Sequence, residues 1–247
     1  MDSTPWQLQQ DRAGLALEGL SGSIHLLRPG DGLTELRRDD SPLPRTRVLG
    51  IAVPGFTPGD AGALIECRVR AGDLAAAYRE SAAWPVRLDT LWRAMPLEGA
   101  FGAIELVLSV RTYTLDCRPQ LTVLSVIKAD EVLAVAEDGT SRPLPPTAGE
   151  WTAVGDARPC CVVLRMAGAA LSYAEMVHPS DFQRDELLRE SDPIVPAQLR
   201  HWIFPSALEK GVILRARIRG FFLPREHDLR LAASAARAFA ASEPPLD

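Results

Sequence analysis

The segment from Tyr173 to Phe182 brings together side chains that could do acid–base chemistry. It reads Tyr-Ala-Glu-Met-Val-His-Pro-Ser-Asp-Phe, with carboxylates at Glu175 and Asp181 and an imidazole at His178. A reaction that needs a general acid and a general base requires such groups to converge in one cleft. On one interpretation His178 is a catalytic acid or base, and Glu175 or Asp181 is its partner. On the other, the segment is a structural strand end whose polar groups are satisfied by hydrogen bonds.

The spacing within this segment restricts which of the groups can meet. Pro179 favours an extended conformation for His178. On a regular strand Glu175 and His178 then point to opposite faces of the sheet, and they could cooperate only across a bulge. Asp181 follows the proline and can fold back toward His178 more easily.

A second candidate is the stripe formed by Arg215, Arg217 and Arg219 on alternate residues. One interpretation is a solvated sheet face on which carboxylates such as Glu66 or Glu105 pair with the arginines. The other is an electropositive surface that holds an acidic ligand, such as a uronic acid or a sulfated sugar, because guanidinium groups bind such anions in a bidentate manner.

Tryptophan side chains could complete a sugar-binding surface. Trp92 and Trp202, together with Trp84, offer flat apolar rings on which a sugar can stack. The alternative for each of them is packing in the core. We therefore take Trp92, Trp202 and the three arginines as the candidate substrate-binding residues.

Composition and motifs exclude several other functions. The 247 residues include 27 Lys and Arg against 32 Asp and Glu, so that the net charge is −5. Binding to a nucleic-acid backbone would show as a basic excess, and we expect no nucleic-acid partner. The four cysteines form no C-x-x-C pair, which argues against a zinc site. Phosphate-binding glycine motifs are absent from the sequence, and we expect neither a metal nor a cofactor.

The first twenty residues carry no targeting signal that we recognise. They include Asp11, Arg12 and Glu18 and have no long apolar run, unlike a signal peptide or a membrane span. We therefore expect a cytoplasmic protein without a membrane partner.

Alternation with a period of two dominates the sequence and predicts strands that bury one face. Residues 121–127 and 160–166 would be apolar on both faces of a strand, which places them in the middle of a sandwich or under a helix. The clearest alternating segments are residues 64–71, 86–93, 104–111 and 212–219.

Helix signals are few. Asp228 to about Ser242 is rich in alanine and leucine, and Asp228 is a suitable N-cap. A narrow apolar stripe at helical spacing predicts that this C-terminal helix docks on a sheet; it consists of Leu229, Ala232, Ala233, Ala236 and Phe239. Gln198 to Lys210 could form a second, short helix that ends at Gly211, although Pro205 would interrupt it.

These elements predict an all-β protein, a large antiparallel β-sandwich with one C-terminal helix. The best candidate linker is the proline-rich stretch 143–146. Because the strand pattern resumes directly after it, we expect residues 1–247 to form a single domain.

The long succession of strands over residues 20–225 resembles the supersandwich architecture of galactose-mutarotase-like proteins. Three stretches are also similar to an uncharacterised bacterial family: Glu105–Thr112, Glu175–Phe182 and Leu208–Ile213. Aldose epimerases with this fold use a glutamate base and a histidine acid. Neither of their motifs can be matched here residue by residue, so the resemblance implies contact with a carbohydrate and assigns no catalytic residue.

Two functions from different classes follow as hypotheses. The first is a carbohydrate-related protein of mutarotase-like fold, epimerase-like or lyase-like, in which His178 works with Glu175 or Asp181 while an arginine holds the substrate. The second is a non-catalytic module that binds a glycan or a protein on a broad sheet face. An enzyme needs His178 and a carboxylate in one pocket, whereas a binding module needs only an exposed polar and aromatic face.

Overall fold

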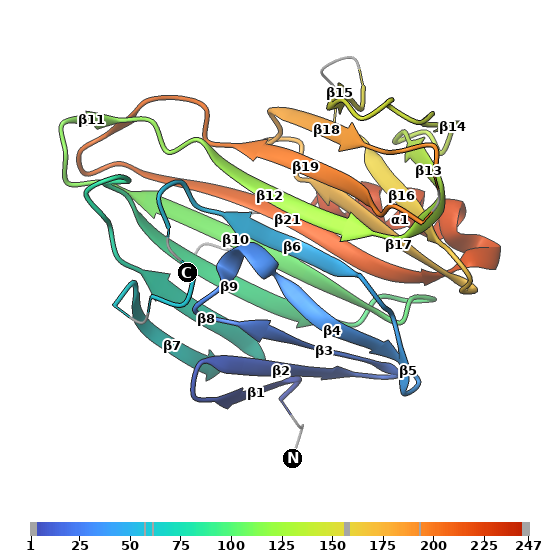
Figure 1. The fold of residues 1–247 in the computed structure, drawn as a ribbon, viewed down its shortest axis with the longest axis horizontal. Helices are drawn as coiled ribbons and strands as arrows, with labels where there is room; N and C mark the ends of the chain where they lie inside the picture. The colour runs from blue at the N-terminus through green and yellow to red at the C-terminus, as the bar shows by residue number, and fades with distance from the viewer. Residues whose placement is uncertain (1–3, 57, 61, 156–158, 193, 244–247) are drawn as a thin grey trace.

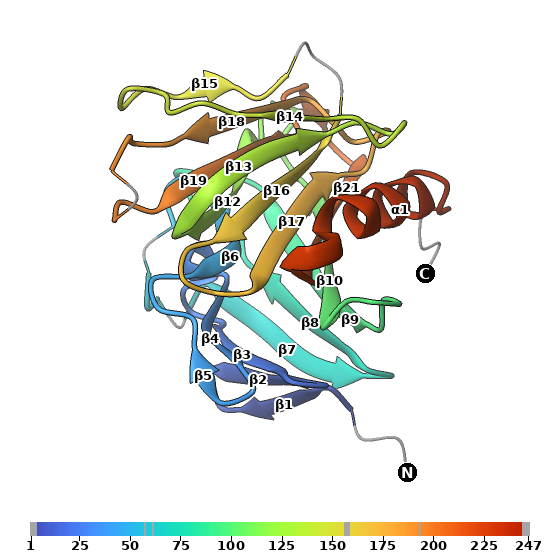
Figure 2. The same ribbon diagram turned by 90° about the vertical axis from the view of Figure 1, so that its right-hand side faces the viewer.

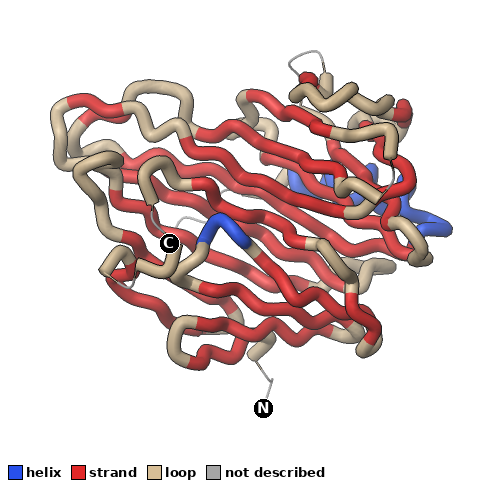
Figure 3. The backbone as a smooth tube through the Cα atoms, viewed as in Figure 1, coloured by secondary structure: helices blue, strands red, loops and turns tan. Residues whose placement is uncertain are grey.

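The fold was analysed in a computed structural model that describes residues 4–56, 58–60, 62–155, 159–192 and 194–243. The two ends of the expected domain, residues 1–3 and 244–247, lie outside the described residues. Two large sheets make up most of the described chain (Figures 1 and 3).

The first sheet has ten strands and contains the N-terminus of the described chain. Short turns connect its early strands into hairpins, while β12, β18 and β19 come from later parts of the sequence. In spatial order its strands are β1 (Trp6–Gln9), β2 (Arg12–Leu17), β3 (Leu20–His25), β4 (Leu33–Arg38), β6 (Arg47–Ala52), β12 (Leu121–Ile127), β19 (Ala197–Ile203), β18 (Arg184–Leu188) and β15 (Thr152–Ala153), with β5 (Ser41–Pro42) paired to β4. A 3-10 turn, η1 (Pro29–Asp31), connects β3 to β4.

The second sheet has nine strands, and its longest strand, β21, lies near the middle. In spatial order the strands are β14 (Ser141–Pro143), β13 (Ala129–Val135), β16 (Cys161–Met166), β17 (Leu171–Val177), β21 (Ile213–Pro224), β10 (Gly102–Arg111), β9 (Arg87–Met95), β8 (Asp73–Tyr78) and β7 (Leu64–Arg70). Its neighbouring strands are antiparallel. A separate two-stranded ribbon pairs β11 (Asp116–Cys117) with β20 (Leu208–Glu209).

A continuous apolar core fills the space between the two sheets. It is built from alternate residues of the strands, and it includes Trp6 from the first sheet and Trp92, Tyr173 and Phe222 from the second. Since successive residues of a strand point to opposite faces, the intervening residues of these strands face outward.

The C-terminal helix α1 (Asp228–Ala240), preceded by the 3-10 turn η2 (Arg225–His227), packs on the outer face of the nine-stranded sheet. Its buried side chains meet Ala174 and Met176 of β17 and Phe221 of β21 in a second apolar cluster. Figure 2 shows α1 on one side of this sheet, away from β7 and β8. The helix therefore covers one part of the outer face and leaves the other part open.

The structure confirms the predicted antiparallel β-sandwich with a C-terminal helix, and the predicted apolar stripe of that helix is the face that docks. The predicted short helix over residues 198–210 is wrong. Ala197–Ile203 is strand β19, because its inward residues Leu199 and Ile203 complete the core between the sheets. No helix in the described part of the chain has the length and apolar character needed to cross a membrane.

Candidate functional site

His178 lies at the end of β17 on the outer face of the nine-stranded sheet, underneath α1. Its ring meets the ring of Phe239 edge to face, with the centroids 5.1 Å apart, and only 7% of the residue is exposed. The Nδ1 atom accepts a hydrogen bond from the backbone N–H of Ser180 at 3.2 Å and lies 2.8 Å from the Ser180 hydroxyl. The helix thus shields the imidazole from solvent.

Asp181 belongs to the same turn and continues this chain of hydrogen bonds. Its Oδ1 accepts from the Ser180 hydroxyl at 2.7 Å, and its Oδ2 accepts from the backbone N–H of Arg217 at 2.9 Å. Burial lowers the pKa of His178, and the positive charge of Arg217 lowers it further, while the Asp181 carboxylate opposes both. His178 is therefore neutral at pH 7, and Asp181 ties the turn to β21.

Glu175 points to the opposite face of β17, as the spacing predicts, and is fully buried between the sheets. Its Oε2 accepts hydrogen bonds from the hydroxyls of Tyr173 and, at 2.6 Å, Ser125, and its Oε1 lies 2.7 Å from Nε2 of His201. The structure therefore does not bring Glu175 and His178 together.

His201 connects two buried carboxylates. Its Nδ1 lies 2.6 Å from Oδ1 of Asp185 on β18, and Nε2 faces Glu175 on β17. Burial lowers the pKa of this imidazole, but the charge of Asp185 and hydrogen bonds to both carboxylates outweigh burial and raise the pKa to about 10. His201 is therefore an imidazolium at neutral pH and donates both of its N–H groups.

The arginine stripe of β21 is divided by α1. Arg217 and Arg219 are 3% and 9% exposed and both lie over the ring of Phe239, with guanidinium carbons 5.6 and 4.1 Å from its centroid. Arg219 pairs with Glu105 on the neighbouring strand β10. Arg215 lies beyond the helix and is exposed.

The two candidate tryptophans lie in different environments. Trp92 is 1% exposed and packs in the core between the sheets, so neither of its ring faces is open to a ligand. Trp202 lies on the outer face of the ten-stranded sheet, where its indole N–H donates to Glu186 at 2.7 Å. The guanidinium groups of Arg184 and Arg200 lie 4.7 and 5.0 Å from its ring centroid.

A cavity of about 770 Å³ opens on the part of the nine-stranded sheet that α1 leaves uncovered, over β7–β10 and the start of β21. We call it the arginine cavity. Leu91 and Val107 contribute an apolar floor. Arginines outnumber carboxylates six to three in its lining, although the whole chain has a net charge of −5: the charged residues are Arg68, Arg70, Arg87, Arg93, Arg111 and Arg215 against Glu66, Asp73 and Asp89.

Two of these carboxylates are already engaged within the lining. Asp89 accepts from Arg87 at 3.1 Å, and Asp73 pairs with Arg93 at 3.0 Å. These pairs use two arginines and two carboxylates, so that Glu66 is the remaining carboxylate of the lining.

Arg111 is the arginine of the lining with a buried donor that lacks an acceptor among the described residues. It stands directly across from Arg87 in the β9–β10 ladder, and like charges in that position destabilise a sheet. Its Nε is buried, and no described residue accepts a hydrogen bond from it. An unsatisfied buried donor costs about 1–3 kcal/mol, so an anion placed between Arg87 and Arg111 would remove two unfavourable effects.

Solved structures show the same fold. A candidate aldose 1-epimerase of Escherichia coli K12 superposes with a TM-score of 0.59 at 12% identity, over 85% of this chain and 97% of that protein. For a candidate aldose 1-epimerase of Klebsiella pneumoniae the TM-score is 0.57 at 9% identity, over 96% and 87% of the two chains. A protein of Synechocystis sp. PCC 6803 gives 0.55 at 12% identity, over 91% and 99%.

This chain has the galactose-mutarotase-like fold. The expected resemblance is thereby confirmed at the level of the fold. No protein-family model matches the sequence, and no curated protein is similar enough in sequence to match it.

Within this mutarotase-like sandwich, sequence reasoning missed Arg111 and the buried pair His201–Asp185. The alternation along the strand did indicate that His201 is buried, since it lies two residues from each of the inward residues Leu199 and Ile203. No comparable signal marked Arg111, because its importance depends on the strand that lies beside it. Among the described residues, no three His, Cys, Asp or Glu side chains cluster closely enough to hold a metal ion.

Proposed function

We propose that this chain binds a carbohydrate that carries an anionic group, such as a uronic acid or a sulfated sugar, in the arginine cavity. The observation that carries the proposal is the environment of Arg111, whose buried Nε meets no acceptor among the described residues and whose cross-strand neighbour is another arginine. A carboxylate or sulfate accepts two parallel hydrogen bonds from a guanidinium group. Arg111 would hold this group, with Arg215 on the neighbouring strand β21 as a second cation.

The rest of the cavity suits the body of a sugar. The apolar floor of Leu91 and Val107 can pack against the C–H groups of a pyranose ring, while Ser109 and Asp89 offer partners for its hydroxyls. A volume of about 770 Å³ lies within the range of small-molecule sites. The likeness to candidate aldose 1-epimerases supports a carbohydrate as the ligand, although fold alone does not define function.

Binding fits the geometry better than catalysis by the residues of the segment 173–182. His178 lies under α1 and Glu175 lies between the sheets, and neither lines the arginine cavity. An epimerase-like or lyase-like reaction would need an acid and a base beside the same ligand, and the described lining contains carboxylates but no histidine. The proposed function is therefore a carbohydrate-binding protein.

Calorimetry with D-glucuronate and D-glucose at low salt tests the proposal. We expect glucuronate to bind and glucose to bind at least about 10-fold more weakly, since a charged hydrogen bond contributes about 1.5–3 kcal/mol. Arg111→Ala should weaken glucuronate binding by about 10- to 100-fold without lowering the melting temperature, because the substitution also removes the unsatisfied donor and the like-charge pair with Arg87. Arg230→Ala, which removes an exposed arginine of α1, is the matched control.

Two results would overturn the proposal. One is equal affinity of the wild-type protein for glucose and glucuronate, because the anion would then contribute nothing. The other is glucuronate binding that Arg111→Ala and Arg230→Ala weaken to the same extent, which would show a general charge effect.

A further inference from the structure

A second cavity, of about 930 Å³, lies on the ten-stranded sheet, far from the arginine cavity in the fold. Its cause is a break in the ladder between β4 and β6. These strands pair at one position, Leu33 with Val48, and at the other end of β4 Arg37 and Arg38 pair with β5. Beyond that position β6 extends by one residue, Arg47, and the segment between β5 and β6 continues beside β4, where the Leu43 N–H donates to the Leu36 carbonyl at 2.8 Å (Figure 1). The cavity opens beside this segment. We call this opening the wedge.

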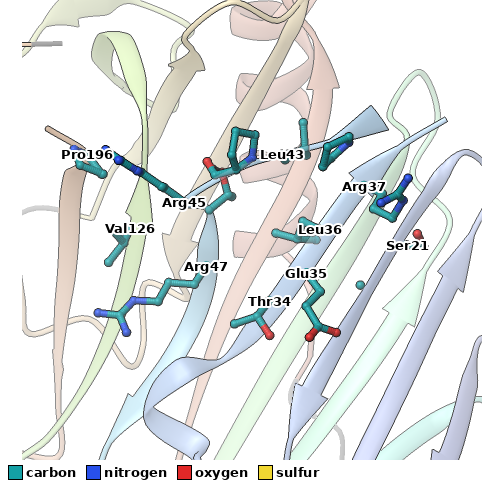
Figure 4. Close-up of a pocket in the computed structure, with 14 residues that line it drawn as sticks. Ser21, Thr34, Glu35, Leu36, Arg37, Leu43, Arg45, Arg47, Val126 and Pro196 are labelled. Carbon is teal, nitrogen blue, oxygen red and sulfur yellow. Dashed lines mark hydrogen bonds between the residues drawn. The ribbon is translucent and has the colours of Figure 1, made fainter. Parts of the chain in front are cut away.

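Six of the fourteen residues that line the wedge are apolar. They come from β4, from β5 and the connection that follows it, from β12 and from the residue before β19, and Figure 4 shows Leu36 and Leu43 among them. Three prolines give the wall little freedom to move, because the ring fixes the backbone angle φ. The apolar lining consists of Leu36, Pro42, Leu43, Pro44, Val126 and Pro196.

Three arginines and one carboxylate stand around this wall. The carboxylate, Glu35, is already engaged, since Arg12 and Ser23 donate to it at 2.9 and 2.7 Å. These hydrogen bonds, first from Ser23 and then from Arg12, lower the pKa of Glu35. The wedge is therefore lined by cations whose charge no carboxylate within it balances.

Of the three arginines of the wedge, Arg45 has the fewest interactions with other described residues. Arg37 donates to the carbonyl of Asp40, and Arg47 lies 3.5 Å from Asp31. For Arg45, in contrast, the described part of the chain provides neither an ion pair nor a hydrogen bond to the guanidinium group. Its backbone has a φ of 55°, a conformation that is uncommon for a residue other than glycine.

We propose that the wedge is a second binding site and that its ligand is an amphiphilic anion, a carboxylate on an apolar acyl chain. The acyl chain would lie along Leu43, Val126 and the prolines of the wall, and the carboxylate would pair with Arg45. This ligand differs from the anionic sugar of the arginine cavity because the wall of the wedge is apolar. The two sites lie on different sheets and do not depend on each other.

A fluorescence competition experiment on the full chain tests this inference. The probe is anilinonaphthalene sulfonate, an aromatic anion that becomes fluorescent in an apolar site. Decanoate should displace it from the folded protein, whereas decyltrimethylammonium, with the same chain length and the opposite charge, should displace it at least about 10-fold less effectively. Equal competition by the two compounds would overturn the proposal.

Two variants assign the binding to the wedge. Arg45→Glu should weaken decanoate binding at least about 10-fold, and Leu43→Asp should abolish it. Arg230→Glu makes the same charge change on α1 and should have no effect. Circular dichroism and melting curves establish that each variant is folded. Unchanged decanoate binding in folded Arg45→Glu would overturn the proposal, whereas loss of glucuronate binding alone in Arg111→Ala would leave it intact.

Discussion

Nε2 of His201 lies 2.7 Å from Oε1 of Glu175, and this hydrogen bond joins the two sheets of the sandwich. Both side chains are fully buried, and Ser125, Tyr173 and Asp185 complete their hydrogen bonds. A slip of either strand by one residue would turn one of the two groups to the outer face. The polar network therefore fixes the position of β19 against β17 more specifically than apolar packing would.

Replacement of His201 by phenylalanine should destabilise the protein by about 3–5 kcal/mol. The substitution leaves Glu175 and Asp185 buried without their shared cation, and the breaking of a buried ion pair has that cost. Urea unfolding at pH 7 measures the loss. His227→Phe, at an exposed position before α1, should change stability by less than about 0.5 kcal/mol. A small effect of His201→Phe would contradict the proposed charge state.

The same histidine predicts a dependence of stability on alkaline pH. The pKa of His201 is raised to about 10 in the folded chain, whereas an unperturbed histidine has a pKa of about 6.5. Its stabilising contribution is therefore complete below pH 6.5 and declines as the pH rises toward 10. We expect the difference in unfolding free energy between wild type and His201→Phe to shrink between pH 7 and pH 10. A difference that stays constant would show that the folded pKa is not raised.

Gly220→Ala should destabilise the fold, because Gly220 of β21 lies against the ring of Tyr173. A Cβ atom at this position would overlap the Tyr173 hydroxyl and stand 2.7 Å from Cζ. Overpacking of this kind costs about 1–3 kcal/mol. Adding Tyr173→Phe should recover part of the loss, and a double-mutant cycle of unfolding free energies measures the recovery. Gly14→Ala, where the added atom would meet nothing closer than 3.8 Å, is the control.

Arg217→Ala should reduce stability by about 1–3 kcal/mol without changing the binding of acidic sugars. The guanidinium group is buried under α1 and donates to the carbonyls of Ser242 and Glu243 at 3.3 and 3.0 Å. The substitution leaves those carbonyls without their donor. Melting curves measure the loss of stability, and glucuronate titrations measure binding. Lost binding at an unchanged melting temperature would instead assign Arg217 to the ligand site.

We propose that residues 1–247 unfold as one cooperative domain. The main apolar core takes side chains from both sheets and from strands distant in the sequence, so that both halves of the described chain contribute to it. A single denaturation transition by fluorescence and circular dichroism is the expected result. Release of two independently folded fragments by proteolysis within residues 143–147 would contradict it.

Much of the fold could be predicted because strand alternation is a local property. Alternation along a strand is enough to predict that Arg215 and Ser109 point outward. It also predicts that Glu175 and His178 point to opposite faces. How deeply each of these side chains is buried cannot be predicted from the alternation. Arg215 and Arg219 are equivalent in the sequence, and they differ because α1 docks over one of them and stops short of the other.

The candidate sites themselves depend on strand order, which the local pattern does not contain. Arg87 and Arg111 become neighbours because β9 pairs with β10 in one particular register. Glu175 and His201 meet across two sheets whose stacking results from the whole core. The helical interpretation of residues 198–210 failed for a related reason, since the partners of β19 lie far away in the chain.

The one-residue pairing of β4 with β6 has a consequence for motion within the native state. Because Leu33 and Val48 are the one ladder pair between them in the described chain, β4 and β6 share few backbone hydrogen bonds. Strands joined by long ladders, such as β12 and β19, share many more. We therefore expect the ten-stranded sheet to open locally between β4 and β6, and amide hydrogens there to exchange faster than those at the centre of the sheet.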